Sequence, residues 1–424
     1  MIRIIKADGS AERKLIETLR SRAAEIGAEI NQTAAEIMAD VKMRGYEAVR
    51  EYSLKLDHCE PREFTEAELQ AAYDACDPKL IRVMEHAANN IRDYNEHLLC
   101  KTLEWTNPDG GCVGRVVRGL TRVGIYVPGG TAAYPSSVLM NAVPAKVAGV
   151  KEVVMVTPPT ENLNNAVLAA AKIAGVDRVI GVGGVQAVAA LMYGAGFIPG
   201  VDKLVGPGSA YVAAAKRMAY GTVDIDMVAG PSEILILADE TANPKFVAAD
   251  LMSQAEHDKL ASSMLLTTSM ELAEAVDQEL VRQMSYLERS EIMEQSFANF
   301  GAIIVCDSLD QGAELADLIA PEHLEICTAE PRALLPKIKN AGAVFLGHWA
   351  PEPLGDYFAG PAHVLPTSGT ARFFSPLSVD SFLKMMSVME FDQTTLSGIH
   401  DEIELFAETE HLTAHANAVK VRFE

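Results

Sequence analysis

An acid next to a histidine is the first candidate for chemistry in this chain. Glu322 and His323 follow Pro321, which ends a helical pattern, and the residues after them alternate like a strand. A carboxylate beside an imidazole can act in general-base chemistry. A histidine at a helix end beside a solvated acid gives the same pattern, and the spacing alone favours that structural interpretation.

Two other pairs have a spacing that can bind a metal ion. Gln254 and His257 are three residues apart near the end of an expected helix, so they share one face. Such a pair is more often a hydrogen-bonded surface pair than a metal site. His411 and His415 are four residues apart, a spacing that can hold a metal ion or stabilise a helix.

A loop over residues 347–370 combines many glycines and prolines with several apolar residues. That mixture is typical of an ordered loop over a site. The loop is therefore expected to lie over a site, with Asp356 and His363 as its chemical groups.

A glycine-rich segment over residues 181–186 follows an expected strand and opens an expected helix. It departs from the Rossmann dinucleotide fingerprint, because Gln186 holds the third glycine position and no acidic residue stands in the usual ribose-binding place. Similar turns at 158–159 and 206–208 end two other strands. One such turn can be a tight connection without a ligand, but three together favour a nucleotide or phosphate ligand.

The elements that must position these residues alternate between strands and helices after residue 110. A strand-like segment over 113–127 is followed by three strand–helix units, whose strands are expected at 153–157, 179–182 and 203–205 and whose helices are expected around 163–174, 185–194 and 209–220. This alternation predicts a parallel sheet with right-handed crossovers and a ligand site at the carboxyl ends of its strands.

A helical region precedes these units, and a second α/β stretch follows them. Helices are expected over 11–30, 32–55, 66–75 and 78–99. Asp77 and Pro78 are the expected N-cap and first residue of the last of these helices. The second stretch has expected strands at 234–237, 264–267 and 303–305 and helical segments at 244–258 and 270–300.

Composition limits the class of protein. The chain has 424 residues, enough for two or three domains, and 36 basic against 58 acidic residues give a net charge of −22. Such an acidic surface argues against nucleic acids and anionic membranes as partners. No apolar run is long enough to span a bilayer, no signal peptide is expected at the start, and six scattered cysteines indicate reduced thiols in the cytoplasm.

Read in order along the chain, these segments resemble one family, the histidinol dehydrogenases, over nearly the whole length. The matching segments are 124–130, 183–187, 228–239, 253–258, 320–325, 355–357, 363–367, 369–373 and 412–416. The resemblance implies an α/β fold with two Rossmann-like domains of the aldehyde/histidinol dehydrogenase type, a helical N-terminal region and a C-terminal tail. The implied units are a larger α/β domain of residues 1–122 plus 238–382 with most metal and catalytic residues, an NAD-binding domain of residues 123–237, and a tail of residues 383–424 that reaches the partner subunit.

The resemblance also implies an activity and a set of site residues. The activity is NAD-dependent oxidation of L-histidinol to L-histidine by way of L-histidinal, the last step of histidine biosynthesis, in a cytoplasmic, zinc-containing homodimer. The implied site consists of the zinc ligands Gln254, His257, Asp356 and His415, the catalytic residues Glu322 and His323, the NAD contacts Tyr126, Gln186 and Ser209, and the substrate contacts Ser232 and Glu410 together with His323 and the zinc ligands.

In the family pattern these residues have separate roles. His323 is the base for the hydroxyl proton, and Glu322 activates the water that hydrates the aldehyde. The metal ion holds the substrate, and His363 lies nearby. Because the C-terminal tail completes the partner's site, Glu410 and His415 are expected to serve the other subunit.

Three positions depart from the family pattern. Ser209 stands where an asparagine is usual, which is expected to shorten a cofactor contact. Ala362 replaces an asparagine before His363 and removes a possible hydrogen bond of the loop, and Val185 replaces an alanine as a mild packing change. All three positions lie outside the implied metal ligands and the Glu–His pair.

Other functions stay open from sequence alone. A dehydrogenase of the same fold could act on another polyol, such as a sulfonated diol, but Glu410 and the Ser232–Glu233 pair favour histidinol. An aldehyde dehydrogenase-type enzyme would need a thiol nucleophile, and Cys327, four residues after His323, lies in an apolar strand pattern typical of a buried residue. A non-enzymatic binding module is the third alternative. Zinc content and substrate-dependent NADH formation distinguish among them.

Overall fold

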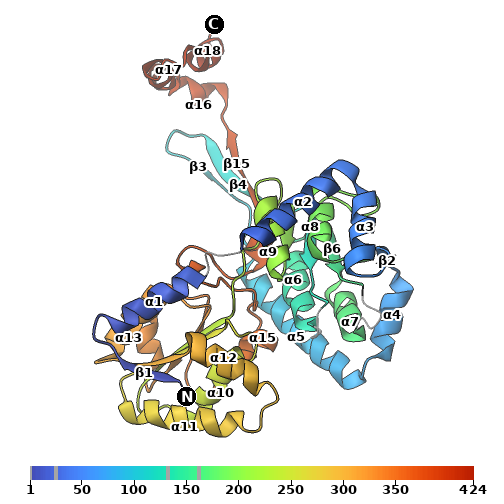
Figure 1. Ribbon diagram of the computed structural model, residues 1–424. Coiled ribbons are helices and arrows are strands. Elements are labelled where there is room, and N and C mark those ends of the chain that lie inside the picture. Colours follow the sequence, from blue (N-terminus) through green and yellow to red (C-terminus); the bar gives the residue numbers. More distant parts are fainter. Residues whose placement is uncertain (1, 23–26, 130–133, 160–163) are drawn as a thin grey trace.

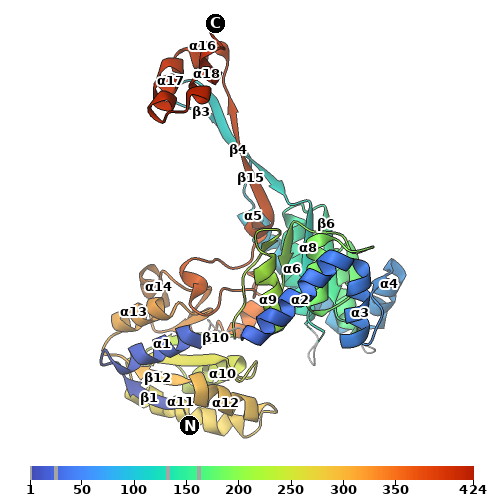
Figure 2. The same cartoon turned by 45° about the horizontal axis from the view of Figure 1, so that its top comes forward.

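The computed structural model describes residues 2–22, 27–129, 134–159 and 164–424. Two α/β bodies lie side by side, and a narrow arm carries the C-terminus away from both (Figure 1 and Figure 2). Part of the expected helix over 11–30, the start of the one around 163–174 and the last residue of the matching segment 124–130 lie outside the described residues.

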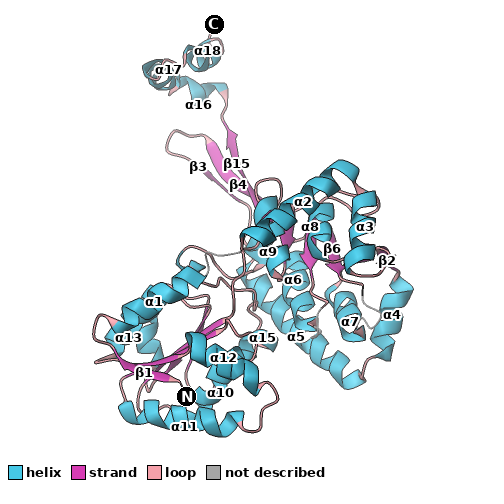
Figure 3. Ribbon diagram, viewed as in Figure 1, coloured by secondary structure: helices cyan, strands magenta, loops and turns pink. Residues whose placement is uncertain are grey.

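The first body is built on a six-stranded sheet in the order β2-β7-β6-β5-β8-β9. Figure 3 shows helices packed around the strands of this body. Its strands are β2 (Arg62–Phe64), β5 (Arg122–Tyr126), β6 (Glu152–Thr157), β7 (Arg178–Gly181), β8 (Lys203–Val205) and β9 (Asp224–Ile225), of which β2 alone is antiparallel to its neighbour. The connecting helices are α6 (Pro135–Val147), α7 (Asn165–Ala174), α8 (Gly184–Tyr193) and α9 (Ala210–Ala219). The predicted parallel sheet is confirmed, and its strand order reverses between β5 and β8.

The second body has a fully parallel six-stranded sheet in the order β1-β12-β11-β10-β13-β14. Its strands are β1 (Arg3–Lys6), β10 (Glu233–Ala238), β11 (Ser262–Thr267), β12 (Ala302–Val305), β13 (His323–Cys327) and β14 (Ala343–Leu346). Its helices are α1 (Ala11–Arg22), α10 (Pro244–Ala255), α11 (Met270–Met284), α12 (Ser290–Phe300), α13 (Leu309–Ile319), α14 (Pro331–Leu334) with η1 (Leu335–Lys337), and α15 (Glu352–Tyr357). Every residue of β10, β11 and β13 is buried, as expected for strands covered on both faces.

The N-terminal region divides between the two bodies. Strand β1 and helix α1 join the second sheet, whereas β2 and the helices α2 (Ala28–Arg44), α3 (Tyr46–Leu56), α4 (Glu66–Ala75) and α5 (Pro78–Leu98) pack on the first. Asp77 caps α5 by accepting a hydrogen bond from the Lys79 amide at 2.7 Å, and Pro78 is its first residue. The packing therefore differs from the expected grouping of 1–122 with 238–382, because the apolar faces of α2–α5 are buried against helices of the first body. Strand β10 already belongs to the second sheet, so the chain returns from the first body to the second before residue 233.

The arm joins two distant parts of the chain. Its sheet is antiparallel and contains β3 (Leu103–Thr106), β4 (Cys112–Gly119) and β15 (Leu383–Glu390). Beyond it lie the short helices α16 (Gln393–Ser397), α17 (His400–Thr409) and α18 (Thr413–Lys420), while η2 (Thr370–Arg372) and η3 (Val379–Phe382) precede it. The strand expected over 113–127 is thus two strands, β4 in the arm and β5 in the first sheet. Among the described residues, no helix is both long and apolar enough to cross a membrane.

Candidate active site

A cavity of about 720 Å³ lies between the two bodies, and we call it the interdomain cavity. One wall comes from the turns after β5 and β8, at the point where the strand order of the first sheet reverses. The opposite wall comes from the amino ends of β10 and β13 in the second sheet. Reversal points of open parallel sheets are where such folds bind ligands, so the first sheet is placed to bind one here.

Glu322 and His323 line the interdomain cavity on the side of the second body. Helix α13 ends at Ile319, the next residue Ala320 has a left-handed φ of 52°, and β13 begins at His323. Both side chains line the cavity and are nearly buried, at 6% and 3% exposure. The solvated helix-end interpretation is therefore wrong for this pair.

The backbone of Glu233 holds both side chains. Its amide donates to Glu322 Oε2 at 2.9 Å, and its carbonyl oxygen lies 2.9 Å from His323 Nδ1. Because a carbonyl oxygen can only accept, Nδ1 carries the ring proton and Nε2 has the free lone pair. The imidazole is thus oriented to accept a proton at Nε2.

Burial shifts both groups towards their neutral forms. The pKa of His323 is lowered mainly by burial, and the charge of Asp356 opposes the shift only in part. Burial likewise raises the pKa of Glu322 well above its ordinary value, against the stabilising hydrogen bond from the Glu233 amide. His323 is therefore a neutral base near pH 7, and an ionised Glu322 is a stronger base than an exposed carboxylate.

Three of the four expected metal ligands meet in the interdomain cavity. Gln254 lies in the last turn of α10, and its carbonyl oxygen accepts a hydrogen bond from the His257 amide at 3.2 Å. Asp356 belongs to α15 and lines the same cavity. The side-chain Oε1 of Gln254 is buried without a hydrogen-bond partner among the described residues. An oxygen donor left in this way, beside an imidazole and a carboxylate, fits a divalent metal ion.

The fourth expected ligand lies elsewhere in this chain. His415 is an exposed residue of α18, and the substrate contact Glu410 is an exposed residue just after α17. Both helices stand at the tip of the arm, away from the two bodies (Figure 2). Within one chain, neither residue lines the cavity.

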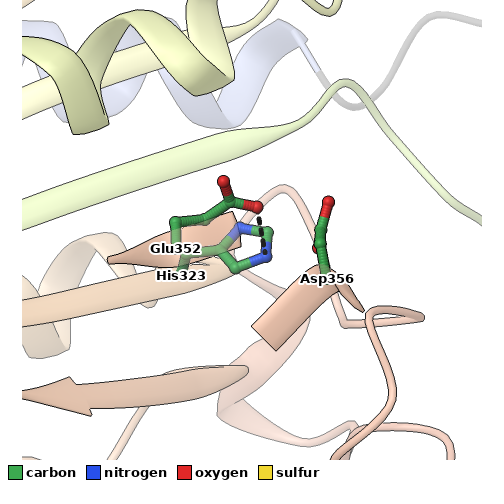
Figure 4. Close-up of side chains that lie close together, drawn as sticks. All are labelled: His323, Glu352 and Asp356. Atoms are coloured by element: carbon green, nitrogen blue, oxygen red, sulfur yellow. Dashed lines mark ion pairs between the residues drawn. The ribbon is translucent and has the colours of Figure 1, made fainter. Parts of the chain in front are cut away.

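Glu352 is a site residue that the sequence reasoning missed. Its Oε1 lies 3.7 Å from His323 Nε2, an ion pair drawn as a dashed line in Figure 4. The Glu352 side chain is 2% exposed. Ligand atoms of His323, Glu352 and Asp356 lie within 4.8 Å of one another, so this group could also hold a metal ion. Burial, with the nearby charge of Asp356, raises the pKa of Glu352 to about 8. The available signal was its position four residues before Asp356, which places both on one helical face.

A second acidic pair lies behind Glu352. Glu325 is 1% exposed, and its Oε1 accepts a hydrogen bond from the Glu352 amide at 2.8 Å. Burial and the nearby Asp250 raise the pKa of Glu325 well above its ordinary range, and burial raises that of Asp250 to about 6. Neither group lines the cavity.

The expected NAD contacts lie at the strand ends of the first sheet. Tyr126 is buried at the end of β5, and its hydroxyl accepts a hydrogen bond from the Gly184 amide at 3.0 Å. Gln186 is fully buried in α8 and donates to Asp57 Oδ2 at 3.2 Å. Ser209 lines the interdomain cavity and is exposed. Asp57 follows the last residue of α3 and lies beside the glycine-rich turn. The spacing of residues in the sequence did not indicate an acidic residue at this turn.

The remaining candidates also have clear positions. Ser232 and His363 line the cavity, and His363 Nε2 is buried without a hydrogen-bond partner among the described residues. Ala362 and Val185, two of the departures from the family pattern, are buried. Cys327 lies at the far end of β13 and does not line the cavity, and burial raises the pKa of its thiol. A thiol nucleophile is therefore not supported.

Comparisons with known proteins agree along the whole chain. The family model for histidinol dehydrogenase matches residues 20–423. The histidinol dehydrogenase of Clostridium acetobutylicum is 52% identical over 428 residues, which cover 100% of this chain and 99% of that relative. That of Lactococcus lactis subsp. lactis is 46% identical over 430 residues and covers 100% of both chains. The crystal structure of histidinol dehydrogenase from Elizabethkingia anophelis matches with a TM-score of 0.95 at 36% identity and covers 100% of this chain and 98% of that one.

The fold, the buried Glu–His pair and these similarities all lead to one conclusion. The chain belongs to the histidinol dehydrogenase family, whose members are NAD-dependent oxidoreductases of histidine biosynthesis.

Proposed function

We propose that this chain oxidises L-histidinol to L-histidine by way of L-histidinal, with NAD as the hydride acceptor. The observation that carries the proposal is the buried Glu322–His323 pair, which lies across the interdomain cavity from the reversal point of the first sheet. That arrangement places acid–base groups opposite a surface suited to a dinucleotide. Family membership favours histidinol over the sulfonated diol.

His323 is proposed as the base in both oxidations. Nδ1 is held by the Glu233 carbonyl, so Nε2 is available to take the hydroxyl proton while the carbon-bound hydrogen leaves as hydride. Bound NAD supplies the electrophile that receives this hydride. The lowered pKa of His323 keeps the imidazole neutral before each step.

Glu322 is proposed to act between the two oxidations. The aldehyde must add water to become a hydrate before a second hydride can leave. An ionised Glu322, held by the Glu233 amide through Oε2, can take the proton of that water. Its raised pKa makes it a stronger base than an exposed carboxylate.

A divalent metal ion, with zinc as our assignment, would be held by Gln254, His257 and Asp356 together with His415 from a second copy of the chain. When bound, the ion would hold the imidazole and amine of the substrate rather than take part in hydride transfer. The unpartnered Oε1 of Gln254 supports this set. We prefer it to the group that contains His323, because a metal ion on Nε2 would block the base.

We also propose a homodimer with shared sites. The arm carries Glu410 and His415 away from the cavity of its own chain, and it leaves Leu405, Phe406 and Met389 more than 65% exposed. Exposed apolar side chains on a narrow arm favour contact with another protein surface. A second copy would bury this surface and receive the two missing site residues. Six free cysteines support a reducing, cytoplasmic location.

A substrate comparison tests the proposed function. Metal-loaded protein with NAD should form NADH from histidinol and from histidinal, and none from a sulfonated diol that lacks the imidazole. The His323→Asn variant should lose roughly 10²–10⁴-fold in rate, as is typical when a general base is removed. His348→Asn is the matched control, because His348 does not line the cavity. NADH formation from the diol but not from histidinol would contradict the proposal.

A further inference from the structure

A buried ion pair lines the interdomain cavity on the side of the first sheet. Lys216 belongs to α9, and Asp226 follows β9. The Lys216 Nζ and Asp226 Oδ1 atoms are 2.5 Å apart, and the two side chains are 3% and 2% exposed. Removing both charges from water is costly, so a buried ion pair often adds little to the stability of the fold. A contribution to stability is therefore not a sufficient explanation for this pair.

Both charges bind the backbone of the same glycine. The Gly206 amide donates to Asp226 Oδ2 at 2.8 Å, and the Gly206 carbonyl oxygen accepts from Lys216 Nζ at 2.8 Å. Asp226 Oδ1 also accepts from the Met227 amide at 2.6 Å. The ion pair thus fixes both polar backbone groups of Gly206. Its amide is held by Asp226 at the end of β9, and its carbonyl oxygen is held by Lys216 of α9.

Gly206 occupies a position that only glycine can take. Its φ is +103°, and a Cβ atom there would lie 2.2 Å from the carbonyl oxygen of Tyr126 at the end of β5. The turn after β8 is therefore pressed against β5 at the reversal point of the sheet. Gly206, Pro207, Gly208 and Ser209 all line the interdomain cavity from this turn.

We infer that Lys216 and Asp226 are positioning residues for the cofactor: they hold the turn at residues 206–209 in the shape that receives NAD. The inference rests on the proposed NAD-dependent function. The ion pair acts through Gly206 and not by its own net charge, because the two charges neutralise each other. Without the ion pair the turn would be free to move, which should weaken NAD binding. In catalysis, misplacement by about 1 Å can cost roughly 100-fold in rate.

A double variant that removes both charges distinguishes two roles of the ion pair. The pair could position the turn, or each charge could only neutralise the other. Lys216→Met alone leaves a buried carboxylate without its partner and is expected to impair folding. Lys216→Met combined with Asp226→Asn leaves no buried charge. The side-chain amide oxygen introduced by Asp226→Asn can still accept from the Gly206 amide, although the amide nitrogen cannot accept from Met227 as Oδ1 does. Lys216→Met removes the group that donates to the Gly206 carbonyl oxygen.

Lys203→Met is the matched control. The Lys203 Nζ atom lies 2.8 Å from Asp224 Oδ2, and this ion pair also links β8 to β9. The Lys203 side chain is 9% exposed, and neither partner lines the interdomain cavity. The control therefore removes an ion pair between β8 and β9, next to the Lys216–Asp226 pair, without touching the turn.

The experiment measures NADH binding to the purified full-length protein by calorimetry, without substrate turnover. Histidinol binding to the metal-loaded protein is measured separately in the absence of cofactor. The double variant should bind NADH at least about tenfold more weakly than the wild type, while its histidinol Kd stays within about twofold. Lys203→Met should change neither affinity by more than about twofold.

Three results would overturn the inference in distinguishable ways. A double variant that binds NADH as tightly as the wild type would show that the pair only compensates charge, and it would leave the proposed function intact. An equal loss of NADH and histidinol binding would show a general structural defect instead of positioning. Wild-type protein that binds no NADH at all would overturn the proposed function and this inference together.

Discussion

Replacing Glu322 with glutamine should separate the two oxidations that we propose. The carboxylate accepts a hydrogen bond from the Glu233 amide at 2.9 Å and is 6% exposed. A glutamine side chain can accept the same bond through its own oxygen, so the backbone of β10 and the orientation of His323 should be retained. What the variant lacks is the group that takes a proton from water.

The expected magnitude follows from that loss. Removal of a general base typically costs roughly 10²–10⁴-fold in rate, which corresponds to about 3–5 kcal/mol in the barrier. This loss should fall on the hydration-dependent second oxidation. Oxidation of histidinol to the aldehyde level depends on His323 Nε2 and should fall by no more than about tenfold in Glu322→Gln.

The assay compares single-turnover NADH formation from histidinol and from histidinal in the same preparation. Glu325→Gln is the control, because Glu325 is also buried but does not line the interdomain cavity. The control should keep the wild-type ratio of the two rates. Equal losses from histidinol and from histidinal in Glu322→Gln would refute the separate role of this carboxylate.

Three further predictions follow from the same geometry. His257→Ala should lose the metal ion while the dimer stays folded, as measured by elemental analysis and light scattering, and full metal occupancy would contradict the ligand set. Mixing His415→Ala with His323→Ala subunits should restore activity up to about one intact site per mixed dimer, whereas no recovery after proven subunit exchange would exclude shared sites. The metal-free protein should lose about 1 kcal/mol of stability as the pH rises from about 7 to 8, because Glu352, with a folded pKa of about 8, keeps a proton that the unfolded chain has released. The buried imidazoles of His323 and His363, whose pKa values are lowered, titrate below this range and do not oppose the slope. Chemical unfolding across this range measures that slope, and stability that rises with pH would show that Glu352 is ionised in the fold.

Local sequence patterns predicted the elements better than their assembly. Alternating strands and helices correctly indicated two parallel α/β stretches, and the Asp77–Pro78 signal marked the start of α5. The arm was not predicted, because β4 pairs with β15 across about 270 residues, as in the pairing of Val117 with Met385. Strand pairing over such a separation leaves no periodic signal in either segment.

The candidate site shows the same limit. The sequence identified Glu322 and His323 as adjacent candidates for general-base chemistry. Their spacing alone, however, favoured a solvated helix end over a buried pair. Burial arises only when β13 pairs with β10, which brings the Glu233 backbone from 89 and 90 residues away. Glu352 reaches His323 Nε2 by the same kind of tertiary contact, which its four-residue spacing from Asp356 does not reveal.

The yield of NADH per histidinol consumed tests the central claim most directly. If the Glu322–His323 pair carries out both oxidations in one site, complete conversion of limiting L-histidinol should form two NADH and one L-histidine. The measurement needs metal-loaded protein, excess NAD and chromatographic detection of histidine and histidinal. A yield of one NADH with histidinal as the end product, or no NADH from histidinol, would contradict the account.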